Sequence, residues 1–305
     1  MLRYTLRQLE YFVAVGETGS IARASERVNV SSPSISAAIT QLEQEFGLPL
    51  FVRQHAQGLS LTQGGRQMLE QARTVLREAG TLMDVAADIS GTVRGPFSVG
   101  CLVTFAQVVM PTLRRAFEET HPEVRLRQHE LNQLDIFSAL RRSEIDLALT
   151  YDLEVPSDLR FQPLYSLPPF VMVSPDHPLA QAVEVTVDDL RPYPMVLLDL
   201  PLSSDYFLSF FAPGARPAIA ERTRDMAVMR SLVANGFGYA IANVRPLNRH
   251  APDGKPLEFI PMAGSVRPMR MGLLMAQDAD RSNLVRAFIE HSESMVAGHA
   301  LPGLD

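Results

Sequence analysis

The chain has 305 residues, of which 46% are hydrophobic and 20% charged, a balance typical of globular proteins large enough for two domains. No apolar run reaches the roughly 18 residues that span a bilayer, so we expect no membrane segment. The net charge of −6 excludes a chain that is basic throughout, as many nucleic-acid-binding proteins are.

The start of the chain and its cysteine content bear on its location. The residues MLRYTLRQLEYFVAV lack the basic start, apolar run and small-residue cleavage site of a secretory signal. Cys101 is the only cysteine, which excludes an internal disulfide and fits a reducing compartment. We therefore expect a cytoplasmic protein.

Residues 5–30 predict two short helices separated by a glycine. Thr5 can cap a helix over 6–18, Gly19 interrupts it, and Ser20 can cap a second helix. The apolar residues expected to face inward are Leu6, Leu9, Phe12, Val13, Val15, Ile21, Ala24 and Val28. Asn29 and Val30 then form the turn into a third helix.

The third helix runs to Phe46 and has two different faces. It opens on Ser31, Ser32 and Pro33, because serine oxygens can accept from the free N–H groups of a first turn and proline fits there. The apolar face comprises Ile35, Ala38, Ile39, Leu42 and Phe46. The opposite face is small and polar, with Ser32, Ser36, Ala37, Thr40 and Gln41. This pair of helices is typical of a helix-turn-helix, whose second helix enters the DNA major groove.

A hairpin is predicted after the third helix. Gly47 can end that helix, and residues 48–53 and 59–62 predict two strands around a polar loop. Arg53 lies at the base of the hairpin, where its guanidinium can pair with a phosphate or enter the minor groove. A solvated surface arginine is the alternative, and the neighbouring helix pair favours the DNA contact.

The candidate DNA-binding region has no net charge. Residues 1–62 contain five arginines and five glutamates, so the phosphate contribution to affinity should be modest for one copy. Two or more copies on one DNA would compensate, and an oligomer is therefore expected.

A long helix over 63–89, which Thr62 can cap, carries a heptad pattern. Apolar residues alternate at spacings of four and three: Met68, Ala72, Val75, Ala79, Leu82, Ala86 and Ile89. The helix could pack on its own domain, but the strict period favours a partner helix. We expect dimerisation through Ala72, Val75, Ala79, Leu82, Ala86 and Ile89.

After a linker at 90–96, strands and helices alternate, which predicts an α/β fold with a mainly parallel sheet. The expected strands are 97–101, 124–130, 146–150, 170–173, 195–198, 218–222, 238–242, 257–261 and 269–275. The expected helices are 105–120, 134–142, 188–190, 205–211, 226–235 and 283–296. Two such lobes usually hold a ligand in the cleft between them.

Several stretches carry a family resemblance. LRQLEYFVAVGETGSIARASERVNVSSPSISAAITQLEQEFGLPLFVRQ, followed by LTQGG, resembles the N-terminal signature of LysR-type transcriptional regulators. VVMPTLRRAFEETHPEVRL, SEIDLALT, VSPDHPLA and LVANGFGYAIANV resemble later parts of the same family. The resemblance implies a fold that is α/β overall, with an N-terminal winged helix-turn-helix, a long linker helix and a bilobal, periplasmic-binding-protein-like effector domain.

The resemblance also implies a division of labour. Residues 1–62 would form the DNA-binding domain, 63–93 the dimerisation helix and 94–305 the effector-binding domain. Lobe I would comprise about 94–165 and 267–305, and lobe II about 166–266. The expected protein is a homodimer or homotetramer that regulates transcription. Its partners would be double-stranded DNA and a small organic effector, for which an anion is the expected class, with RNA polymerase as a further candidate.

The DNA-contacting positions carry over one by one. Members of the family often have Gln where Ser32 stands and Arg where Ala37 stands, and both are short here. Loss of that Arg removes a guanine contact worth roughly 1–3 kcal/mol of discrimination, so readout should lean on DNA shape. The expected DNA-binding residues are Ser32, Pro33, Ser36, Ala37, Thr40, Arg53 and Thr62.

The effector-binding positions centre on Thr104, which lies at the expected start of a helix. Its hydroxyl and the free N–H groups nearby could seat a carboxylate, and a helix cap without a ligand is the alternative. The other candidates fall at strand ends or loops that are expected to line the cleft: Gln133, Tyr151, Ser204 and Phe237.

Enzyme motifs are absent from the sequence. GxSxG, HExxH, CxxC and P-loop patterns do not occur, and we expect no catalytic activity, cofactor or metal. Cys101 falls in a predicted buried strand, where an inert thiol is expected. The alternative to a regulator is a bilobal solute-binding protein or enzyme that carries a DNA-binding head.

Overall fold

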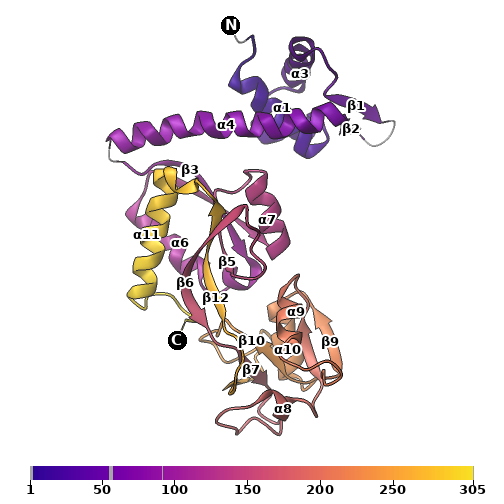
Figure 1. Cartoon of the computed structure of the whole chain (residues 1–305), viewed down its shortest axis with the longest axis vertical. Helices are drawn as coiled ribbons and strands as arrows, with labels where there is room; N and C mark the ends of the chain where they lie inside the picture. The colour runs from indigo at the N-terminus through magenta and orange to yellow at the C-terminus, as the bar shows by residue number, and fades with distance from the viewer. Residues whose placement is uncertain (1–2, 55–57, 91, 305) are drawn as a thin grey trace. The chain divides into compact units, whose positions relative to one another are not determined.

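The computed structural model describes residues 3–54, 58–90 and 92–304, which divide into two compact units between Gly91 and Thr92 (Figure 1). The sequence placed this boundary two residues later, between 93 and 94. No helix among the described residues has the length and hydropathy needed to cross a bilayer.

The first unit opens with the predicted helices. α1 (Leu6–Thr18) starts with a capping box, in which Thr5 accepts from the Gln8 amide and the Gln8 side chain accepts from Thr5. Gly19 ends α1 with a φ of 63°, a conformation that glycine adopts without strain. Ser20 then caps α2 (Ile21–Val28) by accepting from the Arg23 amide.

The start of α3 (Ser32–Phe46) differs from the prediction. Ser31 occupies the cap position but makes no capping hydrogen bond, and its hydroxyl instead lies 2.8 Å from that of Ser34. Pro33 in the first turn and Gly47 at the end, with a φ of 67°, still mark the limits of the helix.

The wing follows as an antiparallel hairpin of β1 (Phe51–Gln54) and β2 (Gly58–Leu61). The Leu59 amide donates to the Gly19 carbonyl at 3.0 Å, so the wing is bonded to the end of α1. Each large apolar side chain buried in the first unit contributes about 1.5–3 kcal/mol to the free energy of folding. The three helices share a core that contains Phe12, Val15, Ala24, Ile35, Leu42 and Leu50.

α4 (Gln63–Ser90) packs on its own unit only along its first half. Leu69 and Ala72 are buried in the core of the first unit, and Gly16 lets Leu69 approach so closely that a Cβ there would meet its Cδ1 at 2.9 Å. Ala72 therefore belongs to this core, a correction to its predicted place in a dimer interface. In this half, α4 packs on its own domain, the alternative to a partner helix, because its apolar stripe already contacts α1.

The second half of α4 exposes apolar side chains. Val75 is 39% exposed, Leu82 71% and Val85 53%. Ala79 is half-buried, and the side chains of Ala86 and Ile89 lie outside the described part of the structure.

Lobe I of the second unit is a five-stranded sheet in the order β4-β3-β5-β12-β6 (Figure 1). The strands are β3 (Gly95–Leu102), β4 (Val124–Leu131), β5 (Leu147–Tyr151), β6 (Leu159–Leu167) and β12 (Met269–Ala276). β3 is parallel to β4 and β5, whereas β12 is antiparallel to both its neighbours. The sheet is therefore mixed, with the predicted parallel pairing confined to three strands.

Helices cover lobe I. They are α6 (Met110–Thr120), α7 (Gln133–Arg141) and α11 (Asn283–Ala297), with a 3-10 turn at Ala279–Arg281. Phe288 of α11 stacks edge-on against Phe97 of β3 and Phe117 of α6, with ring centroids 5.4 and 5.0 Å apart. This aromatic cluster fixes α6 and α11 on the same face of the sheet.

Two predictions for lobe I are wrong in detail. The helix expected over 105–120 is two helices, α5 (Val103–Ala106) and α6, because Pro111 has no N–H to continue the first one. Strand β6 was not predicted, since Pro163 interrupts its pattern. β12 shifts register opposite that proline, between Met271 and Gly272, which lets the strand pass it.

Lobe II contains two small sheets. β7 (Phe170–Val173) lies between β10 (Ala240–Ala242) and β11 (Glu258–Pro261), both antiparallel to it. β8 (Met195–Leu198) and β9 (Ile219–Thr223) are parallel. The helices are α8 (Val187–Leu190), α9 (Ser203–Leu208) and α10 (Met226–Ala234).

Two chain segments join the lobes. One passes from β6 to β7 through Pro168 and Pro169, and the other passes from β11 to β12 through residues 262–268. We call these the crossing segments. β6, from which the chain enters lobe II, pairs along its length with β12, into which the chain returns, so the two crossings lie close together (Figure 1).

Candidate functional sites

The outer face of α3 is exposed, as the sequence predicted. Pro33, Ala37 and Thr40 are exposed, and Ser32 and Ser36 are half-buried. The Thr40 hydroxyl donates to the Ser36 carbonyl at 3.0 Å, so its hydrogen is used within the helix. The side chains of this face are short and offer few free hydrogen-bond donors. They suit close approach of the helix backbone to DNA better than base contacts by long side chains.

The Thr62 hydroxyl, which was predicted to contact a DNA phosphate, already makes hydrogen bonds within the first unit. Its oxygen accepts from the Gly65 amide at 2.8 Å, and its hydrogen is donated to the Pro49 carbonyl at 2.8 Å. A hydroxyl has one hydrogen, so contact with a phosphate requires it to leave Pro49. The side chain of Arg53, the other predicted phosphate contact, lies outside the described residues.

Two arginines pair with one glutamate within the first unit. Glu17 of α1 accepts from Arg27 of α2 at 2.5 Å and from Arg73 of α4 at 2.9 Å. Arg73 is buried and also pairs with Glu70 at 2.7 Å. These charges bind α4 to the helix-turn-helix and leave less positive charge for a DNA phosphate.

Thr104 lies in α5 and is buried, and its hydroxyl faces the Tyr151 hydroxyl, which it approaches without forming a hydrogen bond of ordinary geometry. Neighbouring Val103 packs against the core of lobe II, so this turn lies where the lobes meet. Tyr151 is buried beside it, with its ring 4.6 Å from that of Phe105, and burial raises the pKa of the Tyr151 hydroxyl. Thr104 and Tyr151 are therefore close, as predicted.

Gln133 does not have a free side chain. Its amide nitrogen donates to the carbonyls of Tyr151 at 3.1 Å and Leu153 at 3.4 Å, and its oxygen accepts from the Thr150 hydroxyl. The side chain is buried with every hydrogen-bonding group used, so it holds α7 to the end of β5. We correct its predicted role from ligand contact to structural link.

The remaining two candidates lie elsewhere. Ser204 is half-buried on α9. Phe237 is 48% exposed on the α10 side of lobe II, at a shallow apolar hollow of about 300 Å³ that Val228 and Leu232 also line. The five predicted effector residues therefore do not form one site.

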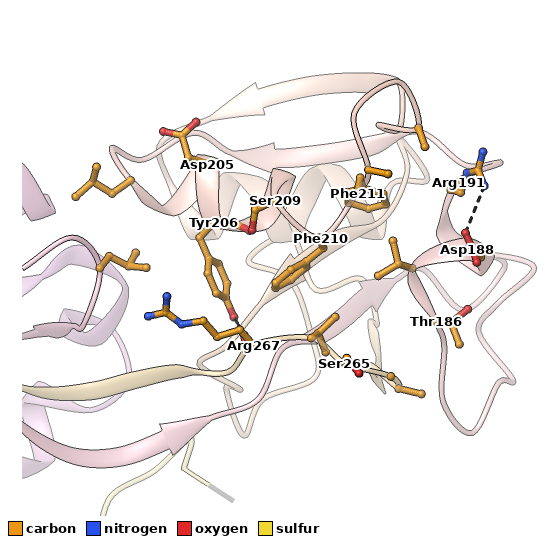
Figure 2. A pocket seen from close by; sticks show the side chains of 18 of the residues that line it. Thr186, Asp188, Arg191, Asp205, Tyr206, Ser209, Phe210, Phe211, Ser265 and Arg267 are labelled. Carbon is orange, nitrogen blue, oxygen red and sulfur yellow. Dashed lines mark hydrogen bonds and ion pairs between the residues drawn. The ribbon is translucent and has the colours of Figure 1, made fainter.

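A larger cavity of about 800 Å³ lies beside the crossing segments (Figure 2). We call it the hinge cavity. Its walls come from α8, α9 and residues 263–267 of the second crossing segment, with Leu153 and Glu154 contributed by lobe I. None of the five predicted effector residues lines it. Charged and aromatic side chains line it, among them Asp205, Tyr206, Phe210, Phe211 and Arg267.

A hydrogen-bond network joins this cavity to both crossing segments. Asp152 accepts from the Arg270 Nε at 2.7 Å and from an Arg267 Nη at 3.4 Å. The Tyr206 hydroxyl donates to the Arg267 carbonyl at 2.5 Å. The Asn243 amide donates to the Tyr206 hydroxyl at 3.2 Å and to the Leu167 carbonyl at 2.8 Å. Lobe I, lobe II and both crossings are thus bonded through one chain of polar groups.

Sequence reasoning missed the hinge cavity, although signals were present. The run SSDYFLSFF at 203–211 places aromatic and acidic residues together, and RPMR at 267–270 places two arginines at the start of a strand. Neither run indicates which segment it will face. That information comes from the fold, which brings residues over 50 positions apart in the chain into one wall.

Comparisons with known proteins agree across the chain. The family model described as "Bacterial regulatory helix-turn-helix protein, lysR family" matches residues 6–66, and "LysR substrate binding domain" matches residues 90–296. The regulator CysB of Haemophilus influenzae is 31% identical over 242 residues, covering 77% of this chain and 74% of that protein. The dual regulator OxyR of Escherichia coli is 30% identical over 241 residues, covering 77% and 78%.

Solved structures show the same architecture. HinK, a LysR family transcriptional regulator from Pseudomonas aeruginosa, has 30% identity and a TM-score of 0.64 over 96% of this chain and 99% of that one. Full-length OxyR C199D from Pseudomonas aeruginosa has a TM-score of 0.74 over 95% and 98%, with 22% identity, and supports the fold alone.

Proposed function

Because the chain belongs to the LysR family of DNA-binding transcriptional regulators, we propose that it binds operator DNA as a cytoplasmic homodimer or homotetramer under the control of a small organic effector. The proposed division is a DNA-binding domain at 1–62, a dimerisation helix at 63–93 and an effector domain at 94–305, with lobes I and II as predicted. The observation that carries the proposal is the exposed outer face of α3 within a helix-turn-helix.

We propose that α3 lies in the major groove with Ser32, Pro33, Ser36, Ala37 and Thr40 toward the bases. The short side chains let the helix backbone approach closely, so sequence preference should depend strongly on groove shape. Arg53 and Thr62 would flank this contact on the phosphates. Because the unit has little free positive charge, two heads per operator would provide the affinity.

The exposed second half of α4 is the proposed dimer contact. Val75 and Leu82 continue the predicted seam, Ala79 lies between them, and Val85 widens the same apolar surface. Exposed apolar residues on a helix that extends past its own core are best explained by a partner helix. Pairing of dimers into tetramers, and any contact with RNA polymerase, rest on the family alone.

We propose that Thr104 contacts the effector where the lobes meet. The Thr104 hydroxyl is buried with only the Tyr151 hydroxyl beside it among the described residues, and a ligand group that bonds to it would complete its poorly formed hydrogen bonding. An organic anion remains the expected class because a carboxylate accepts such a bond. Tyr151 and Ser204 remain secondary candidates, whereas Gln133 and Phe237 leave this proposal.

Peroxide sensing through a thiol is not part of the proposal. Curated relatives from Escherichia coli and Dickeya chrysanthemi are named as activators of hydrogen-peroxide-inducible genes. Here Cys101 is the only cysteine and is fully buried, and burial raises the pKa of its thiol. Since the thiolate is the reactive form, this sulfur is poorly suited to oxidation.

Footprinting of genomic DNA tests the function. The region upstream of the protein's own gene is the first fragment to try, with the full chain and its Arg53→Ala variant. We expect protection of a site with dyad symmetry, weakened in the variant. Failure to bind any genomic fragment would contradict the proposal.

A further inference from the structure

We propose that residues 299–304, which follow the last helix, form a strap that ties lobe II to lobe I and holds the two lobes at one angle. The crossing segments join the lobes covalently, and the strap is a third connection between them, made by packing. Its consequence for regulation rests on the proposed function, whereas the lobe angle itself can be measured without DNA or effector.

The strap begins at the end of α11 that lies nearer to lobe II (Figure 1). The His299 amide donates to the Val296 carbonyl at 3.1 Å, and the Ala300 amide donates to the Met295 carbonyl at 3.0 Å. His299 has a φ of 50°, so these two bonds are those of a Schellman motif. The motif ends α11 sharply and fixes the direction in which the strap leaves the helix.

Two buried leucines anchor the strap. Leu301 is 4% exposed and Leu304 is 7% exposed. Both belong to the hydrophobic core that includes Phe288 of lobe I and Ile241 of lobe II. Burial of large apolar side chains opposes the conformational entropy of a segment that has no helix or strand of its own. The strap is therefore packed as part of the effector domain.

Gly303 lies where the strap meets both lobes. A Cβ placed on it would be 2.8 Å from Cγ1 of Val108 in lobe I, 3.0 Å from the Arg245 carbonyl oxygen in lobe II and 3.5 Å from Cγ1 of Val244. Its φ of 80° also lies in the left-handed region that favours glycine. The strap thus passes through a space that both lobes bound, and only a residue without a side chain fits there.

The lobe II side of this contact is held firmly in place. The guanidinium of Arg245 lies over the ring of Phe259 in β11, 5.6 Å from its centroid. Asn243, two residues earlier, donates to the Leu167 carbonyl at the start of the first crossing segment at 2.8 Å. The strap therefore packs against a part of lobe II that is bound both to the sheet of that lobe and to the hinge.

The lobe I side of the contact adjoins α5, which carries the proposed effector contact. Val108 follows Thr104 by four positions, and its amide donates to the Phe105 carbonyl at 3.2 Å. Val103, the first residue of α5, packs against the core of lobe II. Movement of α5 when an effector binds Thr104 would therefore displace Val108 and change its contact with Gly303.

The strap opposes rotation of the lobes about the crossing segments. Lobes that are joined by two adjacent segments open and close about them as about a hinge. A changed lobe angle would separate or compress the contacts of Gly303, because the residues on its two sides belong to different lobes. Packed interfaces have a few discrete arrangements, so the strap would favour few lobe angles, and an effector would shift the balance between them.

Distances between the lobes test the strap. Val183 of lobe II is 89% exposed and Glu290 of lobe I is exposed, so Val183→Cys and Glu290→Cys provide sites for two spin labels. Cys101 is fully buried, which protects it from the label. Pulsed electron double resonance then measures the separation, with the labelled chain diluted in unlabelled chain so that pairs within one copy dominate.

Gly303→Ala adds a methyl group that meets Val108 and Arg245. We expect the interlobe distance to shift, or its distribution to broaden, by about 2 Å or more. Gly254→Ala is the matched control, because Gly254 has a φ of 83° but a Cβ there would have nothing within 4 Å. The control introduces similar backbone strain without the lobe contact and should leave the distribution unchanged.

Removal of residues 301–305 tests the strap as a whole. Both lobes keep all their strands, so the shortened chain should fold, which near-UV circular dichroism checks, and should show at least the same broadening. If it does not fold, the Gly303→Ala result decides alone. Distributions that match the parent in both variants overturn the proposal. The DNA-face variant Ala37→Glu should keep the parental distances, so failure of DNA binding and failure of the strap are read separately.

Discussion

Leu82→Arg tests whether the exposed half of α4 is a dimer contact. Leu82 is 71% exposed in the single chain, so most of its apolar surface is still available for burial against a partner. Full burial of a leucine is worth about 1.5–3 kcal/mol, which leaves about 1–2 kcal/mol for this side chain. A symmetric dimer contains two copies, so the substitution should remove about 2–4 kcal/mol, before any cost of burying the new charge.

That loss corresponds to a dimer dissociation constant raised by roughly 30-fold to 700-fold. Sedimentation velocity over a range of protein concentrations measures it. The matched control is Leu247→Arg, which changes a leucine that is 74% exposed and lies in lobe II. The thermal stability of each variant should be close to that of the parent monomer, because neither side chain is in a core. Dimers of Leu82→Arg that persist at the concentrations where the parent dimerises would refute the reasoning.

Three further predictions concern the interior of the chain. Glu17→Gln leaves buried Arg73 without its partner on α1, and urea unfolding of the first unit should show a loss of about 1–3 kcal/mol; an unchanged midpoint contradicts the role of this pair. Thr104→Val removes a buried hydroxyl whose only polar neighbour, Tyr151, bonds to it poorly, so thermal stability should change little while any shift caused by an organic acid is lost. A retained shift excludes Thr104 as the contact. Burial raises the pKa of Tyr206 from 10.0 to about 12, so its contribution to stability should be complete below pH 10 and lost as the pH rises toward 12. Urea unfolding across this range should show a smaller alkaline loss in Tyr206→Phe, and an identical loss would rule out Tyr206 as a source.

Local patterns predicted the first unit well because its determinants are local. Thr5 and Ser20 mark helix starts through side-chain contacts within a few residues, and Gly47 marks a helix end through its positive φ. These ends agree with the structure to the residue. Ser31 is the exception, since its hydroxyl turns to Ser34 instead of a backbone amide. A cap residue restricts the possible bonds, but the side chains around it decide which one forms.

The seam on α4 shows what periodicity cannot decide. An apolar stripe records that a face will be buried, not which partner will bury it. Leu69 and Ala72 meet α1 of the same chain because Gly16 admits them, while Leu82 lies beyond the end of that core. We therefore propose a dimer contact only for the second half of α4, which the core of the first unit does not cover.

The effector domain was predicted in outline but not in its site. Buried strands such as 170–173 and 195–198 agree with the structure because continuous apolar runs are distinctive. Gln133 was placed at a strand end, where a free amide was expected, yet three partners from β5 and the residues after it use its side chain. Arg267 and Tyr206 are 61 positions apart, and only the crossing of the lobes brings them together.

The central claim is that the outer face of α3 binds DNA, and an anisotropy titration of labelled operator DNA tests it most directly. Ala37→Glu places a negative charge in the middle of that face, where Ala37 is exposed. Val183→Glu, at a residue of lobe II that is 89% exposed, adds the same charge elsewhere. The account predicts at least about a tenfold loss of affinity for Ala37→Glu and parental affinity for Val183→Glu. Parental affinity in both variants would contradict it.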